Sequence, residues 1–133
     1  MQNFAFILLL IVGFKADPTD STKLHTIADA YIQWTQLGGL HPIQSIFSPD
    51  VQLTYQIGDG DRFTVSFVDY EQKVTHAATA FPRCMHVQSI ELSNEIGKAV
   101  IVDDGETIAL EHLLTLVKGN GTWQIQSILL ASP

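Results

Sequence analysis

The chain contains a single cysteine, Cys84, among its 133 residues. One thiol cannot form an internal disulfide, so a packed core must hold the fold together. Basic residues are also scarce, with 7 Lys and Arg against 14 Asp and Glu and a formal net charge of −7. They are scattered singly along the sequence, whereas binding to nucleic acid or to an anionic membrane requires a clustered positive patch. The composition therefore argues against both of these partner classes.

The sequence also lacks an apolar run of the roughly 20 residues that a membrane-spanning helix needs. Its longest run, Phe4–Phe14, instead has the length of the apolar region of a secretory signal peptide. We therefore predict that residues 1–16 are a signal peptide, cut after Ala16 or alternatively after Gly13, and that the mature protein is secreted or periplasmic. The alternative is an apolar N-terminal strand or helix that docks on a cytoplasmic domain.

Metal-binding patterns are missing as well. The 5 histidines show no H-x-x-x-H spacing, and the lone cysteine forms no zinc-type Cys-His pattern. We expect neither a metal nor a cofactor. With 46% hydrophobic and 16% charged residues, the chain has enough apolar surface for one globular domain. We place this domain at residues 23–133, after a linker and helix cap at 17–22.

The most informative stretch is residues 106–130, which reads as two long strands joined at Lys118-Gly119-Asn120-Gly121. Asn-Gly supplies the positive φ angles that a tight hairpin turn needs. A hairpin of this length must bury one face against another layer, and a long N-terminal amphipathic helix is the natural cover. We predict that the buried face carries Leu113, Val117, Trp123 and Ile125.

The remaining elements follow from apolar periodicity and turn residues. Helices are expected at 23–37, 41–47 and 68–76, and strands at 51–57, 62–66, 85–92 and 98–103, ahead of the hairpin. A loop is expected at 75–83. This order predicts an α+β fold with a mainly antiparallel sheet.

Four pieces of the sequence together resemble a known family: ADAYIQWTQLGGLHPIQSIFSPDVQLTY, VSFVDYEQKV, GKAVIVD and EHLLTLVKGNGTWQIQS. They are similar to the nuclear-transport-factor-2-like (NTF2-like) superfamily, and most to its lumazine-binding-like branch, which is related to ketosteroid-isomerase-like and SnoaL-like proteins. The resemblance implies a cone-shaped α+β barrel in which three helices pack on a strongly curved sheet. It also implies a homodimer through the outer sheet face. For that face we predict a patch of Leu114, Leu116, Ile128 and Leu130.

The resemblance also suggests catalytic candidates. Tyr31 matches the oxyanion-hole tyrosine of the ketosteroid-isomerase-like branch, and Glu111 stands where that branch has a protonated aspartic acid. Tyr55 stands where it has the aspartate that moves the proton. A phenol with an ordinary pKa near 10 is a poor general base at neutral pH, which argues against isomerase chemistry by this route.

Two functions remain open on these grounds. The first is a non-catalytic protein that holds a small, partly apolar molecule in the cone; the second is a cyclase, dehydratase or isomerase acting in the same pocket. We expect Tyr31 and Glu111 to converge there, although Tyr31 could instead be a core tyrosine and Glu111 an acid at a wet barrel mouth. The candidate ligand-binding residues are Tyr31, Trp34, Tyr55, Glu111, Leu113 and Trp123.

Overall fold

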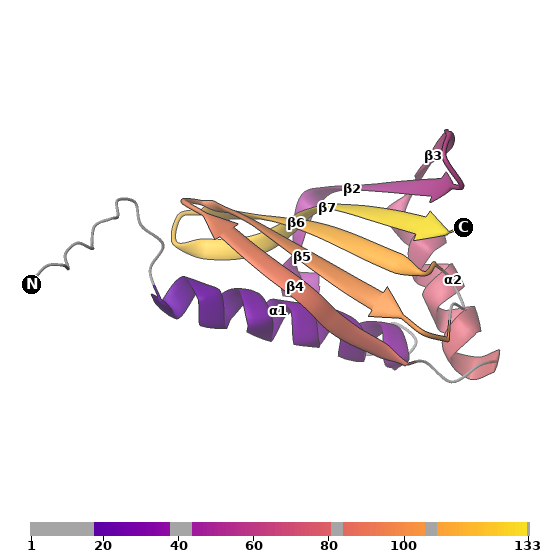
Figure 1. Cartoon of the computed structure of the whole chain (residues 1–133), viewed down its shortest axis with the longest axis horizontal. Coiled ribbons are helices and arrows are strands. Elements are labelled where there is room, and N and C mark those ends of the chain that lie inside the picture. Colours follow the sequence, from indigo (N-terminus) through magenta and orange to yellow (C-terminus); the bar gives the residue numbers. More distant parts are fainter. Residues whose placement is uncertain (1–17, 38–43, 81–83, 106–108, 133) are drawn as a thin grey trace, which may run out of the picture.

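A computed structural model describes residues 18–37, 44–80, 84–105 and 109–132. The signal-peptide prediction and the start of the short helix expected at 41–47 lie outside these residues. Figure 1 labels the elements, which are α1 (Pro18–Gln36), the 3₁₀ turn η1 (Gln44–Ile46), β2 (Phe47–Ile57), β3 (Asp61–Val65), α2 (Phe67–Ala80), β4 (Met85–Ser93), β5 (Ile96–Asp103), β6 (Glu111–Gly119) and β7 (Thr122–Ser132). All the strands expected from the sequence are present.

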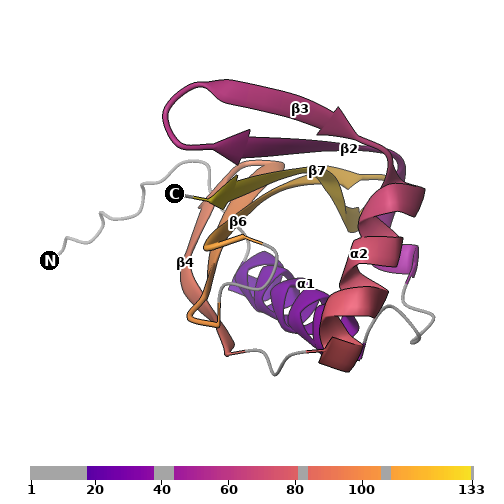
Figure 2. The ribbon, with the colours of Figure 1, turned by 90° about the vertical axis from the view of Figure 1, so that its right-hand side faces the viewer.

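The strands form one six-stranded sheet in the order β3-β2-β7-β6-β5-β4. Its strand pairs are antiparallel except β2 with β7, which run parallel. The sheet curls around α1, and α2 stands across the open side of the curl (Figure 2). The α+β class is confirmed, but the sheet is open rather than a closed barrel. The described residues contain two α-helices and one 3₁₀ turn, so three packed helices are not confirmed.

Helix α1 begins at Pro18, earlier than the predicted Lys23. Proline is tolerated in the first helical turn because the N–H it lacks would have no partner there. Asp20 then lies within the first turn rather than serving as a cap. Its carboxylate accepts hydrogen bonds from Trp123 Nε1 at 3.0 Å and Lys118 Nζ at 3.2 Å. These bonds tie the start of α1 to the β6–β7 hairpin.

The hydrogen bonds of Asp20 should make the stability of the folded protein depend on pH. The hydrogen bond from Trp123 holds the pKa of Asp20 below its ordinary value of 3.8; burial opposes this, and Lys118 adds to it. A lowered folded-state pKa gives stability that is present above the unfolded-state pKa and is lost as the pH falls through the folded-state value. The melting temperatures measured at about pH 6 and at about pH 3 should therefore differ less for Asp20→Asn than for the wild type.

The matched control for this prediction is Asp29→Asn, which changes an exposed carboxylate of the same helix. It should leave the difference between the two melting temperatures unchanged. An equal effect of both substitutions would show that the pH dependence comes from overall charge and not from the Asp20 contacts.

Helix α2 is longer than expected. Ser66 caps it, because Ser66 Oγ accepts the N–H of Asp69 at 3.1 Å and the Ser66 carbonyl accepts the N–H of Tyr70 at 3.0 Å. The helix continues to Ala80, through much of the segment predicted as a loop.

The core lies between α1 and the concave face of the sheet. Helix α1 contributes Leu24, Ala28, Tyr31 and Trp34, all at most 1% exposed. Trp123 and Ile125 are buried against this face as predicted. Leu113 and Val117 are not: they are only partly buried, whereas their neighbours Leu114 and Leu116 are fully buried. The predicted inward face of β6 was therefore wrong.

The reason is the register of the hairpin. Asn120 and Gly121 both have positive φ, as the Asn-Gly turn requires, and the turn pairs Lys118 with Trp123. Cross-strand partners share a face of the sheet, so the even-numbered residues of β6 lie on the side of Trp123.

The predicted outer patch is corrected by the same register and by a β-bulge. The bulge shifts the β6–β7 register between Thr115 and Leu116, and it inserts a residue into β7. Beyond it, Ile128 and Leu130 still face inward, together with Leu114 and Leu116, and all four are at most 1% exposed. These four residues therefore belong to the core and cannot form a dimer surface.

Candidate functional site

A cluster of aromatic side chains fills the space where α1, α2 and the start of β2 meet the sheet. Trp34 is at its centre, with ring centroids at 5.2 Å from Phe47, 5.7 Å from Tyr70, 5.9 Å from Phe67 and 6.1 Å from Tyr31. The ring of Phe67 stacks on Trp34 at an interplanar angle of 22°, and Phe47 meets Phe67 edge-on at 4.9 Å. Such geometries are the favourable ones for aromatic pairs. We call these five residues the aromatic cluster.

Three polar groups meet at the inner end of this cluster. Tyr31 Oη forms a hydrogen bond with Tyr70 Oη and another with His112 Nδ1, the latter at 2.8 Å. The three side chains come from α1, α2 and β6, and each is fully buried. Because a phenol can donate and accept at once, Tyr31 links the other two groups into one network, whose direction follows the tautomer of His112. In an apolar interior such a network is electrostatically stronger than it would be in water.

The outer end of the aromatic cluster reaches the surface. Phe47 and Phe67 line a hollow of about 560 Å³, together with Ser45, Ser48, Pro49, Val51 and Gln124. The Gln124 side-chain amide donates to the Ser45 carbonyl at 3.2 Å and so holds one wall in place. The volume falls within the roughly 300–1,000 Å³ typical of small-molecule sites, and an apolar lining with a few polar groups is typical as well.

Of the candidate ligand-binding residues, Tyr31 and Trp34 lie in the aromatic cluster. Tyr55 lies apart from the hydrogen-bonded trio. Its hydroxyl is 3.4 Å from Ser132 Oγ, and Lys73 Nζ is 5.4 Å from the centroid of its ring.

The expected convergence of Tyr31 and Glu111 is not found. His112 points to Tyr31, and neighbouring residues of a strand point to opposite faces, so Glu111 lies on the outer face of the sheet. Leu113 lies on the outer face with it. Trp123 faces inward, but its indole N–H donates a hydrogen bond to Asp20 at the start of α1, beside the β6–β7 hairpin. The ligand-binding roles proposed for the six candidate residues stay predictions.

Sequence reasoning missed Tyr70, His112, Phe47 and Phe67 as site residues. His112 could have been found from the Asn-Gly register, which places even-numbered β6 residues inside. Nothing in the sequence signals the meeting of Tyr70 with Tyr31, because the two are 39 residues apart and belong to different helices.

The described residues hold no group of three or more His, Cys, Asp or Glu side chains arranged to bind a metal ion. Neither α-helix in the described part of the chain is long and apolar enough to cross a membrane.

Comparison with known proteins gives one family and many structures of the same fold. A family model described as "putative lumazine-binding" matches residues 19–128. No curated protein matches the chain. An NTF2-like protein of unknown function from Silicibacter pomeroyi superposes with a TM-score of 0.69 at 17% identity, covering 86% of this chain and 97% of that one. An NTF2-like protein from Shewanella baltica, also of unknown function, gives 0.70 at 12% identity, with 86% and 94% covered. At these identities the structures establish the fold alone.

Proposed function

The chain belongs to the putative lumazine-binding family of NTF2-like proteins, and on that basis we propose that it binds a small, planar, partly apolar heterocycle without catalysing a reaction. The observation that carries the proposal is the hollow formed by Phe47 and Phe67, because its aromatic floor continues inward to Trp34. A planar ring seated there stacks on Phe67, while Ser45, Ser48 and Gln124 offer polar atoms at its edge. A lumazine has this combination of a flat ring and polar edge atoms.

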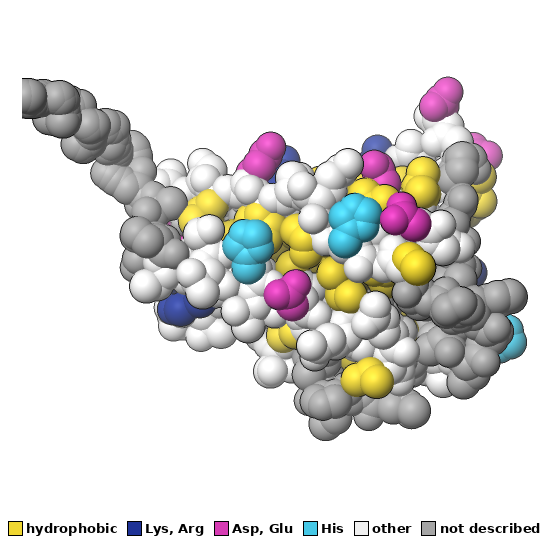
Figure 3. Space-filling model, turned by 60° about the horizontal axis from the view of Figure 1, so that its bottom comes forward, with side chains coloured by type: hydrophobic (Ala, Val, Ile, Leu, Met, Phe, Trp, Pro, Cys, Tyr) yellow, Lys and Arg dark blue, Asp and Glu magenta, His cyan; other side chains and the backbone are white. Residues whose placement is uncertain are grey.

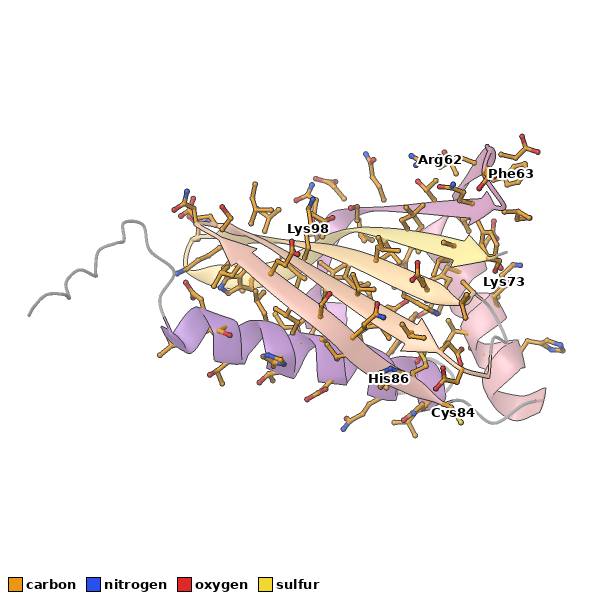
Figure 4. The ribbon with its side chains drawn as sticks, in the orientation of Figure 1. Arg62, Phe63, Lys73, Cys84, His86 and Lys98 are labelled. Carbon is orange, nitrogen blue, oxygen red and sulfur yellow. The ribbon has the colours of Figure 1, made fainter. Side chains whose placement is uncertain are left out.

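The test uses 6,7-dimethyl-8-ribityllumazine, whose own fluorescence anisotropy reports binding. We expect saturable binding to the wild type, weakened in Phe67→Ala by about 1–3 kcal/mol, the usual contribution of one stacked aromatic ring. The matched control is Phe63→Ala, which removes an exposed phenylalanine on the edge strand β3 (Figure 4). Absence of saturable binding, or an equal loss in both variants, would overturn the proposal.

A second candidate function is an enzyme of the isomerase, dehydratase or cyclase type. The observation that favours it is the 2.8 Å hydrogen bond between Tyr31 Oη and His112 Nδ1, because a phenol and an imidazole in contact form a possible acid–base pair. His112 would then be the base that Tyr55 does not supply. Turnover of a β,γ-unsaturated ketone by the wild type, abolished in His112→Gln, would support this candidate, and no turnover by the wild type would exclude that isomerase reaction.

We further propose that the protein is exported and that its mature chain starts near Asp17. The apolar run Phe4–Phe14, which is followed by a polar segment from Asp17, supports this proposal because it has the length of the apolar region of a secretory signal peptide. Intact-mass measurement on protein from the native host should give the mass of a chain starting at Asp17. A cytoplasmic protein that retains Met1–Ala16 would contradict export.

A further inference from the structure

A second groove runs between α1 and the edge strand β4, away from the aromatic cluster. It has a volume of about 790 Å³, and every residue of β4 from Met85 to Ile90 lines it. On either side of the β-bulge between Val87 and Ser89, consecutive residues of β4 point to opposite faces, so all of them can line one groove only if the backbone edge of the strand runs along it. In the described part of the chain, β4 has β5 on one side and no strand on the other. Among the described residues, no strand pairs with the edge of β4 from His86 to Ile90 that borders the groove.

The opposite wall is one side of α1. It consists of residues at helical spacing, namely His25, Asp29, Ile32, Gln33 and Gln36. Figure 3 shows this face of the molecule, with hydrophobic side chains in a band beside histidine rings. Figure 4 places His86 near the beginning of β4, where the strand passes the C-terminal end of α1. A strand edge that faces a helix across a groove is the arrangement in which domains such as PDZ bind an extended peptide as an added strand.

The floor of the groove is apolar and incompletely covered. Val87 and Ile90 of β4 point toward α1 but are only partly buried, whereas Ala99 and Ile101 on the adjacent strand β5 are at most 1% exposed. Ile32 of α1 is also partly buried. An added strand would place its own apolar side chains against these residues.

The charge of the groove favours a basic occupant. Asp29 is exposed on the helix wall, and Asp104 stands beside His86, with His86 Nδ1 and Asp104 Oδ2 3.8 Å apart. No lysine or arginine is among the described residues that line the groove. The chain as a whole carries −7. A lysine or arginine on an incoming segment would meet the carboxylate of Asp29, with no lysine or arginine beside it among the described lining residues.

We propose that this groove binds an extended peptide segment that pairs with the edge of β4, with alternate apolar side chains toward Ile32, Val87 and Ile90 and a basic side chain at Asp29. Backbone hydrogen bonds provide the attachment, and the side-chain contacts select the sequence. The site is separate from the hollow at Phe67 and does not depend on heterocycle binding.

The test is an anisotropy titration of the full chain with a capped, fluorescein-labelled peptide, Thr-Val-Lys-Val-Thr-Ile. We expect saturable binding, weakened about fivefold by Asp29→Lys, as expected for an exposed ion pair. A peptide with glutamate in place of lysine should show the reverse preference. Lysine is a good helix former, so the variant should fold.

Two versions of the peptide, each N-methylated on one of the two alternating sets of backbone amides, test the pairing itself. The version whose methylated amides would face β4 should fail to bind. Asp29→Lys should also leave lumazine affinity unchanged, which separates this proposal from the proposed function. The proposal is overturned by absence of saturable binding, by indifference to Asp29→Lys, or by equal binding of both methylated peptides. The proposal is also overturned if Asp29→Lys forms a smaller assembly than the wild type in light scattering, because a second copy of the chain would then occupy the groove.

Discussion

Replacing Trp34 by alanine should lower the free energy of unfolding by about 3–5 kcal/mol, the usual cost of removing a large buried aromatic side chain. Trp34 is 1% exposed and contacts the rings of Tyr31, Phe47, Phe67 and Tyr70. Its loss leaves a cavity at the only place where α1, α2 and the start of β2 are joined by described aromatic contacts. Chemical denaturation followed by circular dichroism measures the change without relying on tryptophan emission.

The conservative variant Trp34→Phe is the control, because it keeps an aromatic ring in the same place and should cost clearly less. A loss below about 1 kcal/mol for Trp34→Ala is the size expected of an ordinary substitution. That result would show that the aromatic cluster closes over the gap, and that it is not the main link between the two helices.

The second large effect concerns association. We propose that two chains form a homodimer through the outer face of the sheet, using residues other than those predicted from the sequence. Val100, Leu113 and Leu129 are cross-strand neighbours on that face and are only partly buried. They line a hollow of about 370 Å³ with Arg62 and Glu91 among its other residues.

Arg62 and Glu91 lie on the two opposite edge strands, so a two-fold axis that lies in the interface parallel to the strands would bring unlike charges together. Leu129→Asp should therefore convert the dimer into a monomer, because it places a carboxylate in the middle of an apolar contact. Light scattering at micromolar concentration should change from twice the chain mass to the mass of one chain, 14.7 kDa before any processing.

Val68→Asp is the matched control for this variant. It introduces the same charge at an exposed apolar position on α2, where Val68 is 60% exposed, and should leave the assembly intact. A wild-type protein that already has the mass of a single chain would remove the dimer proposal altogether.

Much of the fold follows from local sequence signals. Asn120-Gly121 specifies a tight turn, Ser66 and Asp69 mark the start of a helix, and alternating apolar residues mark the strands. The faces of the strands were harder to predict. The turn was identified, but its register was not carried along β6, so Leu113 and Val117 were assigned to the core in place of Leu114 and Leu116. A shift of one residue moves every side chain of a strand to the other face.

The candidate site illustrates the same limit. Tyr31 and Trp34 could be predicted from the apolar stripe of α1, because helical spacing is a local property. Their partners depend on tertiary structure. His112 faces Tyr31 only because of the hairpin register, and Tyr70 reaches it only because α2 crosses the open side of the sheet. The bulge in β7 has no clear sequence signal, yet it decides that Ile128 and Leu130 face the core.

The position of β7 has a consequence for biosynthesis. This strand is the last of the domain in sequence but lies in the middle of the sheet, with β2 on one side and β6 on the other. Until it emerges from the ribosome, the β2–β3 pair and the β4–β5–β6 group have no strand to join them, and pairing of β2 with β7 must close a long chain loop. The β2–β3 pair and the β4–β5–β6 group can therefore join into one sheet only after β7 has been synthesised.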